Sequence, residues 1–328
     1  MKRLMLLLLG VICVLSFASC GSSEIETYSK TISTMNTFIT INFYDEVEAE
    51  THYQAVRDIF NNVANVTDDF NESPYGNGVY ELNQNRTLEA DDILVDLIKE
   101  SLTMMEETDG FFNPFIGRLS HIWKEVIESD NPCMPDESLI QNEVEIAKNT
   151  SVTIEGNTIT LNGDGNLDLG GIAKGYATMK AVEYLKENDV DGYMISGSSN
   201  ISLGTKAGKS FSVALDKPYN ENDEYETGTI ATLSLKNVNL GASSSKYQST
   251  YVDGIKVHHI INPKTGYPET YHDGIFVICD DAMRADVYST AIFSMDSNMG
   301  ANFVEEKGIE ALFYRSERIT YYTTMFIA

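Results

Sequence analysis

The sequence predicts an α+β fold in a single globular unit. Segments with strand-like and helix-like patterns follow one another without strict β-α-β alternation, which favours an α+β fold over a doubly wound parallel sheet. The chain has 328 residues and a hydrophobic fraction of 42%, so it can bury the core of one large domain or of two fused ones. We find no long repeat and no low-complexity tract, and therefore expect residues 31–328 to form one domain.

Residues 1–19 have the features of a bacterial lipoprotein signal peptide. Two basic residues precede an apolar run over residues 4–17, which is too short to span a membrane as a helix. Small residues then precede Cys20, and a polar tether over residues 20–30 follows. The sequence therefore predicts lipidation at Cys20 and an extracytoplasmic protein that is lipid-anchored to the bacterial cell membrane. Phe17 stands where Leu is usual, and ordinary secretion with an incidental Cys20 is the alternative.

Period-2 and period-3.6 patterns predict the elements of the first half of the chain. Residues 31–44 alternate and are expected to form a strand or two, with Met35-Asn36-Thr37 inside them. Helices are expected over residues 46–70 and 90–106, with a loop over 71–77. A turn over residues 108–115, with two aromatic residues that we expect to be exposed, precedes a short helix over 116–127. Residues 152–154 and 158–161 are expected to form a hairpin.

The second half mixes shorter strands with two further helices. The helices are expected over residues 172–188 and 282–295, the second with Asp280 or Asp281 as its cap. The expected strands cover residues 192–196, 200–203, 211–215, 228–235, 257–261, 274–278, 311–313 and 320–326.

The charge argues against a nucleic-acid-binding protein, and the cysteine spacing argues against a cysteine metal site. The chain has 23 Lys and Arg against 49 Asp and Glu, a net charge of −26, which argues against nucleic-acid binding. An anionic substrate must then be held by local groups: backbone N–H groups, a few lysines or a metal. Cys133 and Cys279 have no metal-binding spacing and we interpret both as ordinary residues.

The stretch over residues 166–175, Asn-Leu-Asp-Leu-Gly-Gly-Ile-Ala-Lys-Gly, is where an extended segment becomes a helix. Gly170 and Gly171 allow close approach of a ligand, and the N–H groups and dipole of a helix N-terminus favour an anion such as phosphate. Asp168 and Lys174 add one charge of each sign. The alternative is a helix start that needed glycines for its bend.

The stretch over residues 258–268 is a strand that runs into a Pro-x-x-Gly turn. Side chains alternate along a strand, so His258 and His259 point to opposite faces and at most one of them lines a given cleft. A structural histidine is the alternative.

The stretch over residues 285–291 contains a carboxylate and a hydroxyl one helical turn apart. Asp286 and Thr290 lie on one face of the helix, and such a pair of oxygens is acceptable for Mg²⁺. The alternative is a solvated Asp and a Thr bonded to a backbone carbonyl. Residues 204–210 look like a phosphate-binding loop, but the spacing is one residue short and an apparent strand follows, so we expect a polar hairpin turn there.

Taken together and in order, these stretches resemble the ApbE family, the FAD:protein FMN transferases, which are often lipoproteins. The longest and most specific matches are Asp-Leu-Gly-Gly-Ile-Ala-Lys-Gly-Tyr-Ala at residues 168–177 and His-Ile-Ile-Asn-Pro-Lys-Thr-Gly at 259–266. Shorter matches lie at residues 35–37, 110–115, 196–200 and 285–291. The resemblance covers nearly the whole mature chain.

The resemblance implies one α+β unit with two related sheet-and-helix halves and an Mg²⁺-dependent reaction. In this reaction the FMN half of FAD passes to a Thr or Ser hydroxyl of an acceptor protein, redox-pump subunits being the usual clients, and AMP is released. Asp286 and Thr290 would bind the metal through side chains and Gly171 through its carbonyl, and His259 would be the base. The residues implied to line the flavin-nucleotide site are Met35, Phe111, Phe112, Asn113, Asp168, Lys174 and Ile261.

The chain departs from the family pattern at several positions. Asn113 and Asn262 replace Asp, Met179 stands where Asp is frequent, Ser198-Ser199 replaces a Gly-Gly pair, and Ser73 aligns with a flavin-stacking Tyr. These changes put the efficiency and the target in doubt more than the reaction class. Two alternatives stay open: an Mg²⁺-dependent FAD pyrophosphatase that yields FMN and AMP, and a non-catalytic flavin-binding lipoprotein.

Overall fold

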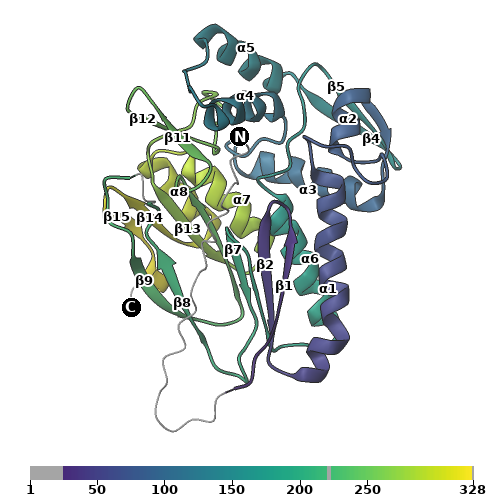
Figure 1. Ribbon diagram of the computed structural model, residues 1–328, viewed down its shortest axis with the longest axis vertical. Helices are drawn as coiled ribbons and strands as arrows, with labels where there is room; N and C mark the ends of the chain where they lie inside the picture. Colours follow the sequence, from purple (N-terminus) through teal and green to yellow (C-terminus); the bar gives the residue numbers. More distant parts are fainter. Residues whose placement is uncertain (1–24, 220–222, 327–328) are drawn as a thin grey trace, which may run out of the picture.

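A computed structural model of the chain describes residues 25–219 and 223–326 (Figure 1). The predicted signal peptide, Cys20 and the first part of the tether lie outside the described residues. Within the described ranges, none of the helices combines the length and the apolar character needed to cross a bilayer.

An eight-stranded antiparallel sheet runs through the molecule. Its strand order is β1-β2-β6-β7-β10-β13-β14-β15. The strands are β1 (Tyr28–Thr34), β2 (Thr37–Phe43), β6 (Tyr193–Ser196), β7 (Asn200–Leu203), β10 (Val238–Ser244), β13 (Gly274–Cys279), β14 (Glu310–Arg315) and β15 (Arg318–Tyr322).

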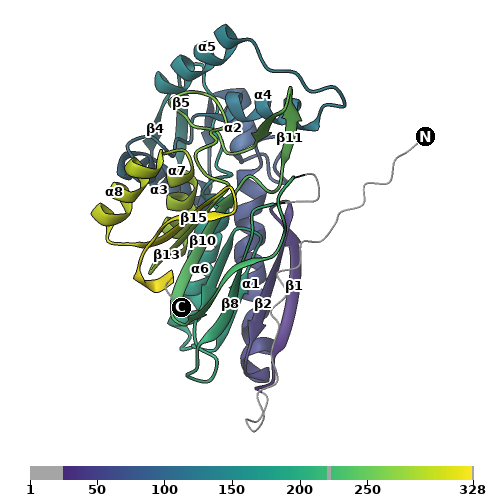
Figure 2. The same cartoon turned by 90° about the vertical axis from the view of Figure 1, so that its left-hand side faces the viewer.

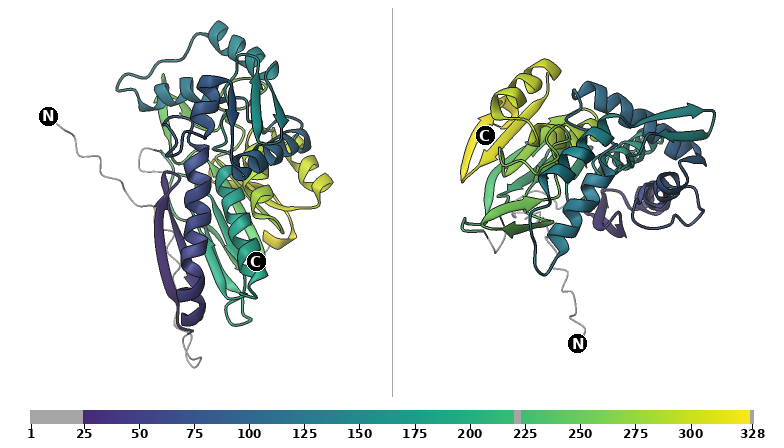
Figure 3. Two further views of the ribbon diagram at one scale, coloured as in Figure 1. Left: turned by 90° about the vertical axis from the view of Figure 1, so that its right-hand side faces the viewer. Right: turned by 90° about the horizontal axis from the view of Figure 1, so that it is seen from above.

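Helices lie against the sheet in two sets. α1 (Glu46–Thr67) and α6 (Ala173–Glu187) lie side by side along the first four strands, as the left view of Figure 3 shows in purple and teal. α7 (Ala282–Phe293) and α8 (Ser297–Lys307) pack on the strands from β10 to β15. Each half of the sheet thus has four strands and two helices, and the prediction of a single α+β unit is confirmed.

The remaining elements extend this body. Two strands, β8 (Phe211–Asp216) and β9 (Thr229–Leu235), form a hairpin whose apolar residues pack with Met194, Leu240 and Phe276 of the sheet in a second core. α2 (Val79–Asn85) and α3 (Asp92–Glu107) follow α1, and β3 (Thr87–Glu89), β5 (Thr158–Asn162) and β4 (Ser151–Glu155) form a small sheet. The described part of the chain ends in a short 3₁₀ helix, η1 (Thr324–Phe326).

Helices α4 (Gly117–Glu128) and α5 (Glu137–Lys148) form a separate layer with the hairpin β11 (Ser249–Val252)–β12 (Ile255–His258). Figure 2 shows α4 and α5 at the upper end of the molecule, with β11 beside α4. This layer has a core of its own, in which Leu119, Trp123 and Ile140 pack with Val257 and Ile261.

Several expectations need correction. Tyr28 pairs with Phe43, so the first strand begins inside the predicted tether and before residue 31. The strand expected over residues 257–261 ends at His258, and that over 320–326 ends at Tyr322. Phe111 and Phe112, expected to be exposed, are 8% and 5% exposed, because both join the main core beside α3 and α6.

Candidate active site

Close packing of α6 on α7 forms the centre of the site. Gly175 lies so near α7 that an added Cβ would be 2.6 Å from the Cβ of Asp286 and 2.9 Å from the Cα of Met283. This approach lets the Gly175 N–H donate a hydrogen bond to Asp286 Oδ2 over 2.8 Å. A donor from the first turn of α6, at the positive end of its dipole, therefore faces a carboxylate on α7.

Asp286 is a buried carboxylate whose negative charge is only partly balanced by the groups around it. Its exposure is 4% and burial raises its pKa, while the charge of Lys174, the Gly175 N–H and the nearby Ser199 hydroxyl lower it. No lysine or arginine in the described part of the chain forms an ion pair with it. A buried charge without a full counter-charge is costly, and a bound cation would remove that cost.

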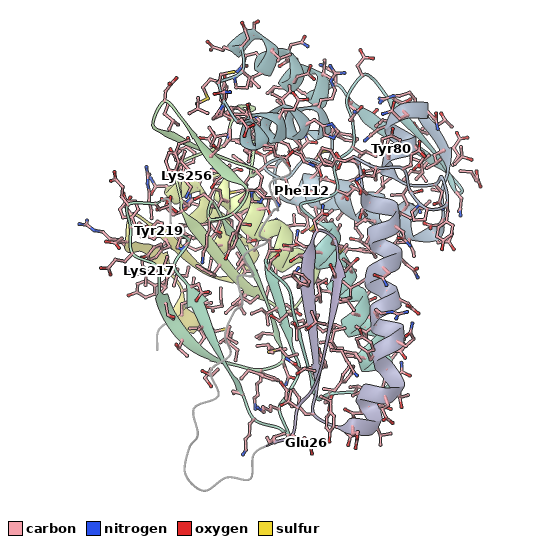
Figure 4. The ribbon with its side chains drawn as sticks, viewed as in Figure 1. Glu26, Tyr80, Phe112, Lys217, Tyr219 and Lys256 are labelled. Atoms are coloured by element: carbon pink, nitrogen blue, oxygen red, sulfur yellow. The ribbon has the colours of Figure 1, made fainter. Side chains whose placement is uncertain are left out.

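Thr290 and Gly171 lie beside this carboxylate. Thr290 Oγ1 donates to the Asp286 carbonyl over 3.2 Å and lies 3.3 Å from Ser243 Oγ of β10. A Cβ on Gly171 would be 3.8 Å from Thr290 Cγ2, an ordinary van der Waals contact, and 3.3 Å from Phe112 Cε2, a tight one. The predicted metal ligands therefore come from two elements that meet here, and Phe112 borders them. Figure 4 labels Phe112 at the centre of the molecule.

The donor set suits a hard cation with few protein ligands. The described residues contain no group of three or more His, Cys, Asp or Glu side chains that could hold a metal. One carboxylate, one hydroxyl and one carbonyl are all oxygens, which Mg²⁺ prefers, and Mg²⁺ usually completes its shell with water and phosphate. The residues present therefore fit Mg²⁺ better than a transition metal that prefers nitrogen or sulfur.

The glycine turn before α6 differs from its predicted form. The Gly170 N–H, expected to be available to an anion, donates to Asp168 Oδ1 over 2.7 Å. Lys174 Nζ lies 3.3 Å from the Gly170 carbonyl, to which it donates. The side chains of Asp168 and Lys174 thus bond to the backbone of the turn itself.

The two adjacent histidines, His258 and His259, have different surroundings. The His258 ring is 2% exposed, and its Nε2 lies 2.9 Å from the Glu269 carbonyl. His259 has an exposed side chain, yet the surrounding protein and then the charge of Lys174 lower its pKa to about 4, while backbone carbonyls and Asp168 act in the opposite direction. His259 is therefore neutral at pH 7 and within electrostatic reach of both Lys174 and Asp168. His258 is thus buried and His259 exposed, which is the difference expected for rings on opposite faces.

Four of the predicted flavin-site residues have local partners of their own. Phe111 lies under Lys264, whose Nζ is 4.0 Å from the ring centroid. Asn113 Oδ1 accepts from the Phe115 N–H over 2.8 Å, which occupies the side chain locally. Ile261 packs in the α4–α5 core, and Met35 occupies the β1–β2 turn with a φ of 51° and packs against the main core.

Residues that the sequence did not indicate also support the site. Ser243 bonds to Thr290 and to Ser289, whose Oγ is 2.9 Å away. Glu107 at the end of α3 accepts from Arg284 Nη2 over 2.8 Å and from the Tyr288 hydroxyl over 2.6 Å, which fixes α7. The only sequence signal at these residues is the Ser-Ser-Ser run at residues 243–245, and this run matches no functional motif.

Comparison with known proteins gives consistent results. The sequence profile of the ApbE family matches residues 35–313. An FAD:protein FMN transferase of Treponema pallidum (strain Nichols) is 26% identical over 92% of this chain and 89% of its own, and one of Haemophilus influenzae is 24% identical over 94% and 92%.

Two solved structures share the fold. The ApbE protein of Thermotoga maritima superposes with a TM-score of 0.77 at 24% identity, covering 88% of this chain and 94% of its own. The flavin transferase ApbE of Vibrio cholerae has a TM-score of 0.75 at 20% identity, covering 92% and 98%. Profile, relatives and fold agree, and this chain belongs to the ApbE family.

Proposed function

We propose that this chain is an FAD:protein FMN transferase that passes the FMN half of FAD to a Thr or Ser hydroxyl of an acceptor protein and releases AMP. The names of the relatives support this activity. The observation that carries the proposal is the contact of the first turn of α6 with α7, in which the Gly175 N–H donates to Asp286 Oδ2 over 2.8 Å. This contact holds the buried carboxylate beside the glycine turn that precedes α6.

We further propose that Asp286, Thr290 and the Gly171 carbonyl hold Mg²⁺. When bound, this ion would neutralise charge on the pyrophosphate of FAD. The buried carboxylate without an ion pair supports the assignment, because a cation is the group that its surroundings lack. Lys174 would add a second positive charge beside the same phosphates.

The chain's own residues would handle the proton and the leaving group. Neutral His259 would accept the proton of the acceptor hydroxyl, and the hydroxyl oxygen would form a bond to the phosphorus of the FMN half. The bond from that phosphorus to the bridging oxygen would break, and the bridging oxygen would leave with AMP. Since His259 is exposed, water could replace the hydroxyl, which would give the FAD pyrophosphatase reaction instead.

A single assay separates these activities. The full chain is incubated with FAD, Mg²⁺ and an acceptor domain that carries the flavinylation Thr, and the acceptor mass and free AMP are measured. Equal amounts of AMP and of acceptor carrying FMN support the transferase. AMP without an adduct supports the pyrophosphatase, and flavin that stays uncleaved supports a non-catalytic binding protein. A matched acceptor with Thr changed to Ala controls for transfer at other residues.

The first residues of the sequence support a proposal for the cellular setting. We propose that the mature chain begins at a lipidated Cys20 and acts outside the cytoplasm, anchored to the membrane, on acceptor proteins such as redox-pump subunits. The basic pair, the apolar run and Cys20 support this setting. The charge of −26 supports the absence of nucleic acid among its partners.

A further inference from the structure

A second histidine has an oriented ring. His121 on α4 and Asp69, which follows α1, form a pair in which Nε2 and Oδ2 are 2.8 Å apart. The Asp69 side chain is 8% exposed and that of His121 is 37% exposed. Phe70 stacks on the imidazole at 4.1 Å between centroids and 14° between planes, and Lys124 Nζ lies 3.4 Å from the Phe70 centroid. The ring is thus fixed by a carboxylate and by an aromatic face.

The pair lies next to the segment that carries Asp168. The Asp168 N–H donates to the Pro114 carbonyl over 2.8 Å, and Gly117, one helical turn before His121 on α4, packs against the Asn166 and Leu167 carbonyls. The charge of Asp168 acts on Asp69 and His121, and it also acts on His259. Asp168 therefore lies within electrostatic reach of two imidazoles on different elements. A purely structural role, in which the pair joins α4 to the chain after α1, explains the hydrogen bond. It does not explain the coupling to Asp168 or the part of the ring that stays in solvent.

Charged groups around His121 favour its protonated form. The hydrogen bond to Asp69 is the largest influence and raises the pKa of His121, and the charges of Asp69 and Asp168 act in the same direction. Burial and Lys124 lower it. An imidazolium whose Nε2–H is bonded to Asp69 keeps its Nδ1–H as a donor, whereas the neutral ring with the same bond to Asp69 has a lone pair at Nδ1.

We propose that His121, oriented by Asp69, binds the flavin nucleotide by donating a hydrogen bond from Nδ1 to one of its acceptor oxygens. The inference rests on the proposed function, since it takes the substrate to be FAD. The oxygen belongs either to a phosphate or to a carbonyl of the flavin ring, and both accept such a bond. Loss of the proton from His121 removes the donor, so FAD binds more weakly at high pH.

The test measures FAD binding without turnover. The dissociation constant of FAD is measured by quenching of flavin fluorescence in EDTA from pH 5.5 to 9, for the full chain and for three variants. His121→Gln can keep a bond to Asp69 without a titrating ring, and Asp69→Asn keeps the ring but removes the charge that holds its proton. His52→Gln is the matched control, because His52 is a partly buried helical histidine whose Nδ1 lies 3.1 Å from the Tyr184 hydroxyl.

We expect the native chain and the control to lose about tenfold in affinity or more as pH rises, which is typical for loss of a hydrogen bond to a charged group. His121→Gln should bind weakly at every pH, and Asp69→Asn should show the same fall at a lower pH. Because burial lowers the pKa of His258 to about 3 and that of His272 to about 4, these two residues do not titrate in this range. Folding of each variant is checked by its thermal unfolding transition.

Other ligands identify the oxygen and separate the two proposals. If riboflavin shows the same pH dependence as FAD, the acceptor is on the ring, and if only FMN and FAD show it, the acceptor is a phosphate. If His121→Gln and Asp69→Asn both bind FAD with native affinity and native pH dependence, the proposed role of His121 is wrong. In that case, FMN transfer by the native chain would still support the proposed function. A native chain that binds no FAD would overturn both.

Discussion

Asp286→Asn should remove most of the stabilisation of the folded chain by Mg²⁺. The substitution removes a buried negative charge and keeps an oxygen that can accept from the Gly175 N–H. The pKa of Asp286 is raised in the folded chain, so as pH rises the unfolded chain loses this proton first and the folded state becomes less favourable. At neutral pH and without metal, the variant should therefore be at least as stable as the native chain.

The size of the Mg²⁺ effect follows from mass action. At a concentration of 100 times the dissociation constant, a ligand that binds only the folded state adds about 2.7 kcal/mol. In a domain of this size 1 kcal/mol corresponds to a shift of about 2 °C or slightly more, so the native chain should gain about 5 °C. The variant, which lacks the charged ligand, should gain less than about 1 °C.

Thermal unfolding with EDTA and with Mg²⁺ tests this prediction. The variant should be at least as stable as the native chain in EDTA and less stabilised than the native chain by Mg²⁺. Asp280→Asn is the matched control, since it removes an exposed carboxylate just before α7 and should keep the native response. FMN transfer measured in parallel should be lost only in Asp286→Asn. An equal Mg²⁺-induced shift in the native chain and in Asp286→Asn would refute the metal assignment.

Three further outcomes are expected. Gly175→Ala should lower the free energy of unfolding, measured by urea titration, by about 1–3 kcal/mol through overpacking. The control Gly192→Ala should change this free energy little, because the nearest contact of an added Cβ there is 3.6 Å away. The free energy of unfolding should fall as pH drops from 6.5 towards 4, by about 2.7 kcal/mol per pH unit near pH 5. Burial lowers the pKa of His258 to about 3 and that of His272 to about 4, so the unfolded chain takes up protons at these residues first. A free energy of unfolding that stays constant over this range would contradict the burial of two neutral histidines. Cys20→Ala should move the protein from the detergent phase to the aqueous phase in a phase-partition assay, and an unchanged distribution would exclude lipidation at that residue.

The secondary structure could be predicted where one periodic pattern dominates. The long helices α1, α3, α6 and α7 carry apolar residues every three or four positions, and all four were expected within a few residues. β10 was missed because buried residues occur on both faces of the strand, and small Gly, Ala and Ser side chains replace the alternation that marks a strand. α8 was missed because only Gly300, Phe303 and Val304 are buried in it.

The candidate site could be predicted only where its residues share one element. Asp286 and Thr290 are four residues apart on a helix, so their common face follows from helical geometry. Ser243 reaches Thr290 from a strand that no pattern indicated, and Glu107 reaches α7 from the end of another helix. Such contacts depend on how the sheet and the helices pack, and a linear pattern does not contain this information.

The structure also changes the reason for the glycines in the strongest motif. The sequence suggested that Gly170 and Gly171 open the backbone to a phosphate, yet the Gly170 N–H is already bonded to Asp168. Gly175, further along the motif, has the tightest packing, because any side chain there would meet α7. The motif therefore brings the first turn of α6 onto α7, so that a backbone N–H supports Asp286 from within the core. A substitution at Gly175 should consequently disturb Asp286 more than one at Gly170, although Gly175 itself contacts no predicted substrate atom.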